Sequence, residues 1–98
     1  MKNVEDIKLG KMYMFTSIDI SVYQFQNPNL DWYAEKTLTL REKTPFIPLQ
    51  VIKVENCFDG ILMRKMIHPF RRIKVLLGDG TICYLAEDVV WLRCLKEL

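Results

Sequence analysis

The side chains that could carry chemistry are few in this sequence and widely separated. The single histidine, His68, precedes Pro69, and the three cysteines are Cys57, Cys83 and Cys94. A histidine that acts as a general base needs an orienting carboxylate and a nucleophile near it, and the sequence indicates neither. The cysteines lack the close spacing that a zinc site requires. We therefore expect no enzymatic activity, no metal site and no cofactor.

Basic and aromatic residues are the other candidates, because they can bind a partner without catalysing a reaction. The segment MRKMIHPFRR interleaves four cations with methionine and phenylalanine, and a separate segment, residues 17–36, holds four aromatic residues with no strong period. Exposed Trp and Tyr rings serve as anchors in protein interfaces, and cations steer an acidic partner. The predicted partner-binding residues are Tyr23, Phe25, Trp32, Tyr33, Arg64, Lys65, Phe70, Arg71 and Arg72.

Each of these two segments also has a plainer interpretation. The aromatic residues could fold back into a small core of their own, and the basic segment could be a solvated loop. The basic segment could instead bind nucleic acid, gripping phosphates while its apolar side chains stack on bases. We keep nucleic-acid binding through residues 64–72 as the alternative to a protein partner.

The elements that must position these residues are clearest near the C-terminus. Apolar and polar residues alternate over 72–77 and again over 81–85, with Gly78-Asp79-Gly80 between the two runs. Glycine accepts the positive φ angles of a tight turn, so this pattern predicts a β-hairpin in which Asp79 serves the turn. A helical turn at 86–88 and a last strand should follow.

Earlier in the chain the pattern predicts a first strand around Tyr13 and Phe15, and a long loop or irregular hairpin over 17–36. A strand is expected over 46–54. Pro45 and Pro48 predict an edge, a bulge or a bend at its start, because proline cannot donate a ladder hydrogen bond.

Residues 57–71 are the least decided part of the chain. Asp59 could cap one short helix near 59–67, because several of the apolar residues that follow fall near helical spacing and Pro69 would end it. An apolar loop fits this segment equally well.

The hairpin, helical turn and short last strand over residues 72–92 resemble the C-terminal half of a Src homology 3 type barrel. The resemblance implies a mainly β fold, a single small barrel of five to six strands with long loops. In the adaptor domains of that family, aromatic and proline side chains form grooves for polyproline peptides. The corresponding places here are Arg72, Ala86 and Val89, so the resemblance implies that those aromatic walls are missing.

Composition limits the remaining choices. Ninety-eight residues, half of them hydrophobic, can close one small core, so residues 1–98 should form one domain. The net charge of +2 is too small to predict a nucleic-acid or membrane partner, and no apolar run approaches the roughly 18–20 residues of a membrane span.

We interpret the chain as a cytoplasmic, non-catalytic accessory protein of a phage or bacterial type that docks on a larger protein. Trp91 follows Val89 and Val90, so the last strand would place apolar groups outward. A second subunit would cover them, which makes a homo-oligomer one expected outcome.

Overall fold

The chain folds mainly into β-strands. The computed structural model describes residues 3–66, 69–87 and 89–98. Two short helical turns accompany the strands, namely η1 (Val4–Asp6) and α1 (Val89–Leu92). The strands are β1 (Tyr13–Phe15), β2 (Ile20–Gln24), β3 (Lys36–Leu40), β4 (Phe46–Val54), β5 (Cys57–Asp59), β6 (Arg64–Met66), β7 (Phe70–Leu77), β8 (Ile82–Ala86) and β9 (Leu95–Glu97).

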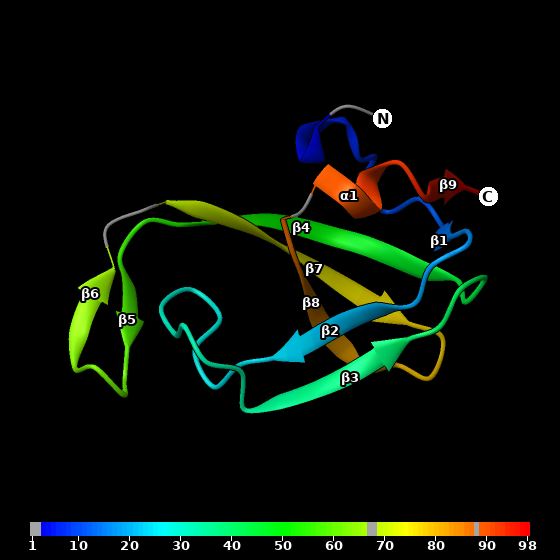
Figure 1. Cartoon of the computed structure of the whole chain (residues 1–98). Helices are drawn as coiled ribbons and strands as arrows, with labels where there is room; N and C mark the ends of the chain where they lie inside the picture. Colours follow the sequence, from blue (N-terminus) through cyan, green and yellow to red (C-terminus); the bar gives the residue numbers. More distant parts are fainter. Residues whose placement is uncertain (1–2, 67–68, 88) are drawn as a thin grey trace.

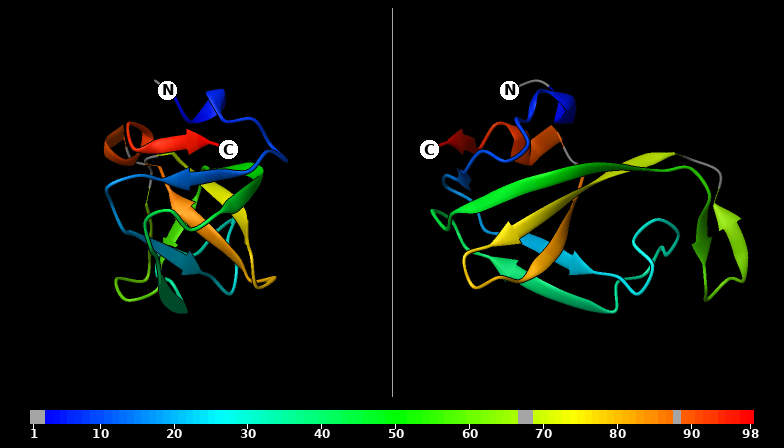
Figure 2. Two further views of the ribbon diagram at one scale, coloured as in Figure 1. Left: turned by 90° about the vertical axis from the view of Figure 1, so that its right-hand side faces the viewer. Right: turned by 180° about the vertical axis from the view of Figure 1, so that it is seen from behind.

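Seven of these strands form one antiparallel sheet in the order β3-β2-β8-β7-β4-β1-β9. The sheet curls strongly into a half-barrel, which the end-on view of Figure 2 shows. The expected closed barrel of five to six strands is wrong. The segment expected as a long loop or irregular hairpin, residues 17–36, supplies strand β2, which pairs with β3 directly after that segment. These two strands extend the sheet beyond β8 instead of closing it.

The hairpin predicted over 72–85 is confirmed. Ile73 pairs with Leu85 and Val75 with Cys83, and all four side chains are buried. The Leu77 amide donates to the Thr81 carbonyl at 2.9 Å.

The turn of this hairpin has the role predicted for Asp79. Gly80 has a φ of +88°, which favours glycine, and Asp79 Oδ1 accepts from the Thr81 amide at 2.9 Å. That hydrogen bond lowers the pKa of Asp79.

Strand β4 shows the irregularity that its prolines predict. Its pairing with β7 shifts between Pro48 and Gln50, which is a β-bulge or a similar irregularity. The strand lies between β7 and β1 rather than at an edge. Because β1 pairs with β4 only at Phe46, Pro48 interrupts no regular ladder on that side.

The short helix considered near 59–67 does not form over residues 59–66, and residue 67 lies outside the described part of the chain. Strands β5 and β6 make a separate two-stranded hairpin, which stands beyond the end of the main sheet in Figure 1. Asp59 does cap a turn, because its Oδ1 accepts from the Ile61 and Leu62 amides, each at 3.0 Å. The chain then reverses into β6 because backbone pairing, starting with Asp59 opposite Arg64, takes the place of helical hydrogen bonds.

The helical turn expected at 86–88 lies further along the chain, at α1. Residues 89–92 were expected to be β-type, but they form this one turn, and the last strand starts at Leu95. Trp91 explains the shift, because its ring is buried edge-on to Phe15 with centroids 5.6 Å apart and its Nε1 donates to the Ala86 carbonyl at 2.8 Å.

The core has two parts. The main cluster fills the curl of the sheet and includes Phe15, which stacks on Phe46 at 5.2 Å between ring centroids. A smaller cluster of Ile52, Val54 and Cys57 lies apart from it, with Phe70 and Tyr84 packed against it.

Replacing Phe15 by alanine should lower the free energy of unfolding by about 3–5 kcal/mol, because it removes a fully buried ring and leaves a cavity. Urea unfolding measures the change. Leu49→Ala, at an exposed position of β4, is the matched control and should cost less than about 0.5 kcal/mol. Equal losses in the two variants would contradict the assignment of Phe15 to the core.

Candidate functional site

Arg72 holds the candidate site together, although its side chain is only 3% exposed. The guanidinium lies over the ring of Phe25, with Cζ 3.7 Å from the ring centroid, and 5.0 Å from the centroid of Phe70. Its Nη1 donates to the Pro28 carbonyl at 2.6 Å, and its Nη2 donates to the Asp31 carbonyl. Arg72 therefore fastens residues 25–35, called the long loop below, to strand β7.

The surroundings of Arg72 have opposite effects on the pKa of its guanidinium group. Burial lowers the pKa of Arg72, while the nearby Cys57 and Asp31 raise it. An arginine stays protonated under such shifts, so the cation is retained. Its charge is used on two carbonyls and two rings, so Arg72 is buried and not placed on the surface, where steering a partner would require it.

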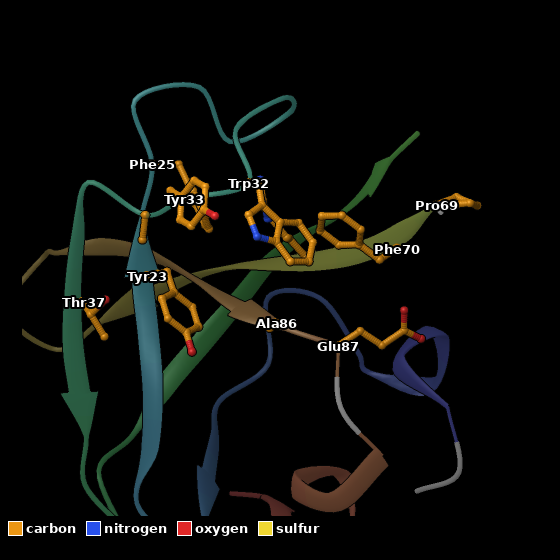
Figure 3. Close-up of a pocket in the computed structure, with 11 residues that line it drawn as sticks. Tyr23, Phe25, Trp32, Tyr33, Thr37, Pro69, Phe70, Ala86 and Glu87 are labelled. Atoms are coloured by element: carbon orange, nitrogen blue, oxygen red, sulfur yellow. The ribbon is translucent and has the colours of Figure 1, made fainter. Parts of the chain in front are cut away.

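The long loop and the strands beneath it enclose a groove of about 750 Å³. This aromatic groove, shown in Figure 3, is lined by Tyr23, Phe25, Trp32, Tyr33, Ala34, Thr37, Pro69, Phe70, Arg72, Ala86 and Glu87. The volume falls within the range of roughly 300–1,000 Å³ that is usual for ligand pockets.

Ring contacts fix the walls of the aromatic groove. Trp32 meets Phe70 edge-on, with centroids 5.8 Å apart, and Phe25 lies 6.2 Å from Tyr23 and 5.9 Å from Tyr84. Trp32 and Tyr33 are still 41% and 47% exposed. The aromatic segment is thus neither wholly buried nor free, because Phe25 packs on Arg72 while Trp32 and Tyr33 stay accessible.

The backbone of the long loop is also bonded to the separate hairpin. The Phe58 amide donates to the Leu30 carbonyl at 2.8 Å, and the Trp32 amide donates to the Phe58 carbonyl at 3.1 Å. Asp31 and Phe58 form an isolated parallel bridge. The hairpin β5–β6 therefore supports the segment that carries Trp32.

The structure brings six of the nine predicted binding residues to this groove and separates the other three. The six are Tyr23, Phe25, Trp32, Tyr33, Phe70 and Arg72. Arg71 lines a neighbouring cavity of about 320 Å³ beside Glu5 and Glu87. Arg64 and Lys65 lie exposed on β6, in the separate hairpin.

Arg72 and Ala86, two of the positions at which the sequence places no aromatic residue, line the aromatic groove. The rings of the groove come from other segments, namely the long loop, Tyr23 on β2 and Phe70 on β7. The side chain of Val89 lies outside the described residues.

Glu87 is a residue of the groove that the sequence analysis missed. Arg71 binds its carboxylate through Nη2 and through Nε, the latter at 3.1 Å from each oxygen, and Arg71 Nη1 also lies 2.8 Å from Glu5 Oε1. The hydrogen bonds that Arg71 donates to Glu87 lower the pKa of Glu87 and raise the pKa of Arg71. The one indication of this role in the sequence is that position 87 directly follows the strand at 82–86.

None of the three cysteines lines the aromatic groove. Burial raises the pKa of Cys83 to about 11 and also raises the pKa of Cys57, so both thiols are protonated at neutral pH. His68 lies outside the described residues. Among the residues that are described, no group of three or more His, Cys, Asp or Glu side chains could hold a metal ion.

The chain matches no protein-family model, no curated protein and no solved structure. In the described part of the chain, no helix is long and apolar enough to cross a membrane.

Replacing Arg72 by lysine should destabilise the protein by about 1.5–3 kcal/mol, the range for one lost charge-assisted hydrogen bond, because an ammonium cannot reproduce the fork that reaches both carbonyls. Amide exchange at Trp32 should accelerate relative to Val75 in the main core. Arg64→Lys, at an exposed position, is the control and should leave both quantities unchanged. Unchanged exchange at Trp32 in Arg72→Lys would show that the long loop does not depend on this side chain.

Removing the Glu87 carboxylate should change how stability depends on pH. The pKa of Glu87 is lowered in the folded state, so its contribution is fully present above the unfolded value of about 4.3 and is lost as pH falls through the lower folded value. Wild type should exceed Glu87→Gln in stability at neutral pH, and the difference should shrink below about pH 4.3.

Thermal unfolding across a pH series measures this difference. Glu55→Gln controls for the loss of one negative charge, since Glu55 contacts Lys53 at 3.4 Å on an exposed surface. A difference between wild type and Glu87→Gln that stays constant down to about pH 3 would contradict the prediction.

Proposed function

We propose that this protein is a non-catalytic binding module that docks on a protein partner through the aromatic groove. The observation that carries this proposal is the half-exposed pair Trp32 and Tyr33 on a loop that Arg72 holds in place. Tyr and Trp bury large areas at low entropic cost, and a pre-organised loop lowers the cost of binding further. The groove thus has the properties of a preformed docking site.

The chemistry of the groove indicates what part of a partner would fit. Its interior is mainly apolar, while Glu87 lies at one end and Glu35, exposed on the long loop, follows Ala34 of the lining. Complementary charge suppresses wrong partners and fixes the register of the right one. We infer that the partner presents apolar side chains flanked by basic residues. This replaces the expected steering of an acidic partner, because Arg71 is ion-paired and Arg72 is buried.

We further propose that the half-barrel is an enlarged relative of the Src homology 3 type. Its elements follow the order that the resemblance implies, from a long first hairpin to a tight hairpin, a helical turn and a short last strand. Strands β2 and β3 of the first hairpin contribute Tyr23 and Thr37 to the lining of the groove. Fold likeness does not carry function with it, so the proposed docking depends on the groove alone.

Several features support the non-catalytic part of the proposal. The thiols of Cys57 and Cys83 are buried and protonated, and the Glu87 carboxylate is held ionised by Arg71. Groups in these states are poor nucleophiles and poor general acids. We also propose a cytoplasmic location, which suits three free cysteines, and a phage or bacterial accessory role, which rests on size alone.

The nucleic-acid alternative is weakened by the distribution of its four cations. Arg71 and Arg72 are committed within the chain, which leaves Arg64 and Lys65 on the hairpin. A protein that makes 6–10 phosphate contacts loses roughly 10³–10⁵ in affinity between 50 and 200 mM salt. A groove filled by apolar side chains should respond far less.

The test compares proteins recovered from native cells by the wild-type chain and by Trp32→Ala/Tyr33→Ala. Two hot-spot rings together should account for about a hundredfold or more in affinity, so the double variant should lose the specific partner. Leu9→Ala/Leu49→Ala is the matched control, because it removes two exposed apolar side chains outside the groove and should retain the partner. Equal recovery by both double variants would rule out the aromatic groove as the docking surface.

A further inference from the structure

The hairpin β5–β6 ends in three consecutive exposed apolar residues. Ile61, Leu62 and Met63, called the apolar tip below, are 73%, 55% and 73% exposed. Figure 1 and the right-hand view of Figure 2 show this hairpin standing clear of the main sheet. Side chains of this size so far from any core are unusual on a small protein unless another surface covers them.

The apolar tip is held in a defined shape. Asp59 is buried, and its carboxylate accepts from the first two tip amides, while Met63 has a φ of +51°. A non-glycine residue in the left-handed region is strained, and such strain is often found where the chain must present a side chain in a fixed direction. The apolar tip is therefore a pre-shaped projection.

The charges near the apolar tip and near the aromatic groove differ. Arg64 and Lys65 follow the tip directly and are exposed, whereas the acid of the hairpin turn, Asp59, is buried. Beside the groove Glu35 and Lys36 are exposed, and Glu87 lies in the lining, where it is paired with Arg71. An apolar projection with a basic flank thus matches an apolar groove that has the exposed carboxylate of Glu35 beside it.

We propose that the apolar tip of one copy of this protein occupies the aromatic groove of a second copy. The inference rests on the proposed function, since it names an occupant for the same groove. Within one chain the tip does not reach the groove, because all three of its side chains stay more than half exposed. A second copy would cover both apolar surfaces with one kind of contact.

The placement of the two surfaces suits a reciprocal exchange. The hairpin base is bonded to the long loop at Phe58 and Trp32, so tip and groove belong to neighbouring segments at one end of the molecule. In a two-fold dimer each copy gives a tip and receives one, and the same pair of surfaces is used twice. An outside protein with a similar apolar and basic segment would then compete with the second copy for the groove.

Sedimentation of the purified protein over a range of concentrations tests this proposal. Wild type should self-associate, and Ile61→Ser/Met63→Ser should weaken the association by about ten- to a hundredfold for each docked tip. Trp32→Ala should have an effect of similar size from the groove side. Leu49→Ser is the matched control, since it changes an exposed leucine on β4 and should leave the association unchanged.

A mixing experiment separates a tip-in-groove contact from other modes of association. The tip variant keeps an intact groove, and the groove variant keeps an intact tip. An equimolar mixture should therefore form a heterodimer with one intact contact at lower concentration than either variant forms its own homodimer, in which both contacts lack one side. Circular dichroism of each variant confirms that it is folded, so failure to associate is not mistaken for unfolding.

Four results would overturn the proposal. The first three are a wild type that stays monomeric up to about 1 mM, an association that the tip variant leaves unchanged, and a mixture that forms no heterodimer. The fourth is a wild type that does not self-associate but sediments with vesicles of phosphatidylcholine and phosphatidylserine, while the tip variant does not sediment with them. That result would assign the tip to a lipid surface. None of these results contradicts the proposed function, which is tested separately. If the tip variant recovers a foreign partner and the groove variant does not, the proposed function is supported.

Discussion

The candidate site depends on one buried cation. Arg72 replaces its lost hydration with two backbone carbonyls of the long loop and with the faces of Phe25 and Phe70. A planar guanidinium can do this because its donors lie in one plane while its faces stack on rings. The long loop contains no strand of the main sheet, so this side chain supplies a connection that the sheet itself does not provide.

The same interaction decides which aromatic residues remain accessible. Phe25 is used as a platform for the guanidinium, and Phe70 is shared between Arg72 and Trp32. Trp32 and Tyr33 lie beyond this stack and keep close to half of their surface in solvent. A loop pinned at Pro28 and Asp31 thus presents two rings in fixed positions, which is the condition under which aromatic residues bind with little entropic cost.

Local patterns in the sequence predict the hairpin of β7 and β8 well, because alternation and a glycine turn act over a few neighbouring residues. Arg72 shows where such patterns end. It alternates with the buried Ile73 and should face solvent, yet both are buried because the long loop covers the opposite face of β7. Strand alternation gives the two faces, but only contacts between distant segments determine whether the second face is covered.

The hairpin of β5 and β6 shows the same limit from the other side. Helical spacing near residues 59–67 would require an apolar surface for the helix to cover, and the described structure places none there, since Ile61 and Met63 face solvent. Pairing of Asp59 with Arg64 and bonding of Phe58 to the long loop decide the outcome instead. The aromatic groove could not be predicted from local sequence patterns for the same reason, because its walls meet only in the folded chain.

The division of the core bears on how the aromatic groove can act. Phe70 and Tyr84 pack on the small cluster of Ile52, Val54 and Cys57, apart from the main cluster inside the curled sheet. Opening of a structure is easiest where few apolar contacts hold it, so the end that carries the groove and the hairpin should open at lower free energy than the rest. Binding at the groove would stabilise this end by mass action while the main core stays unchanged. We therefore expect the order of this end to depend on Arg72 and, under the proposed function, on the partner in the groove.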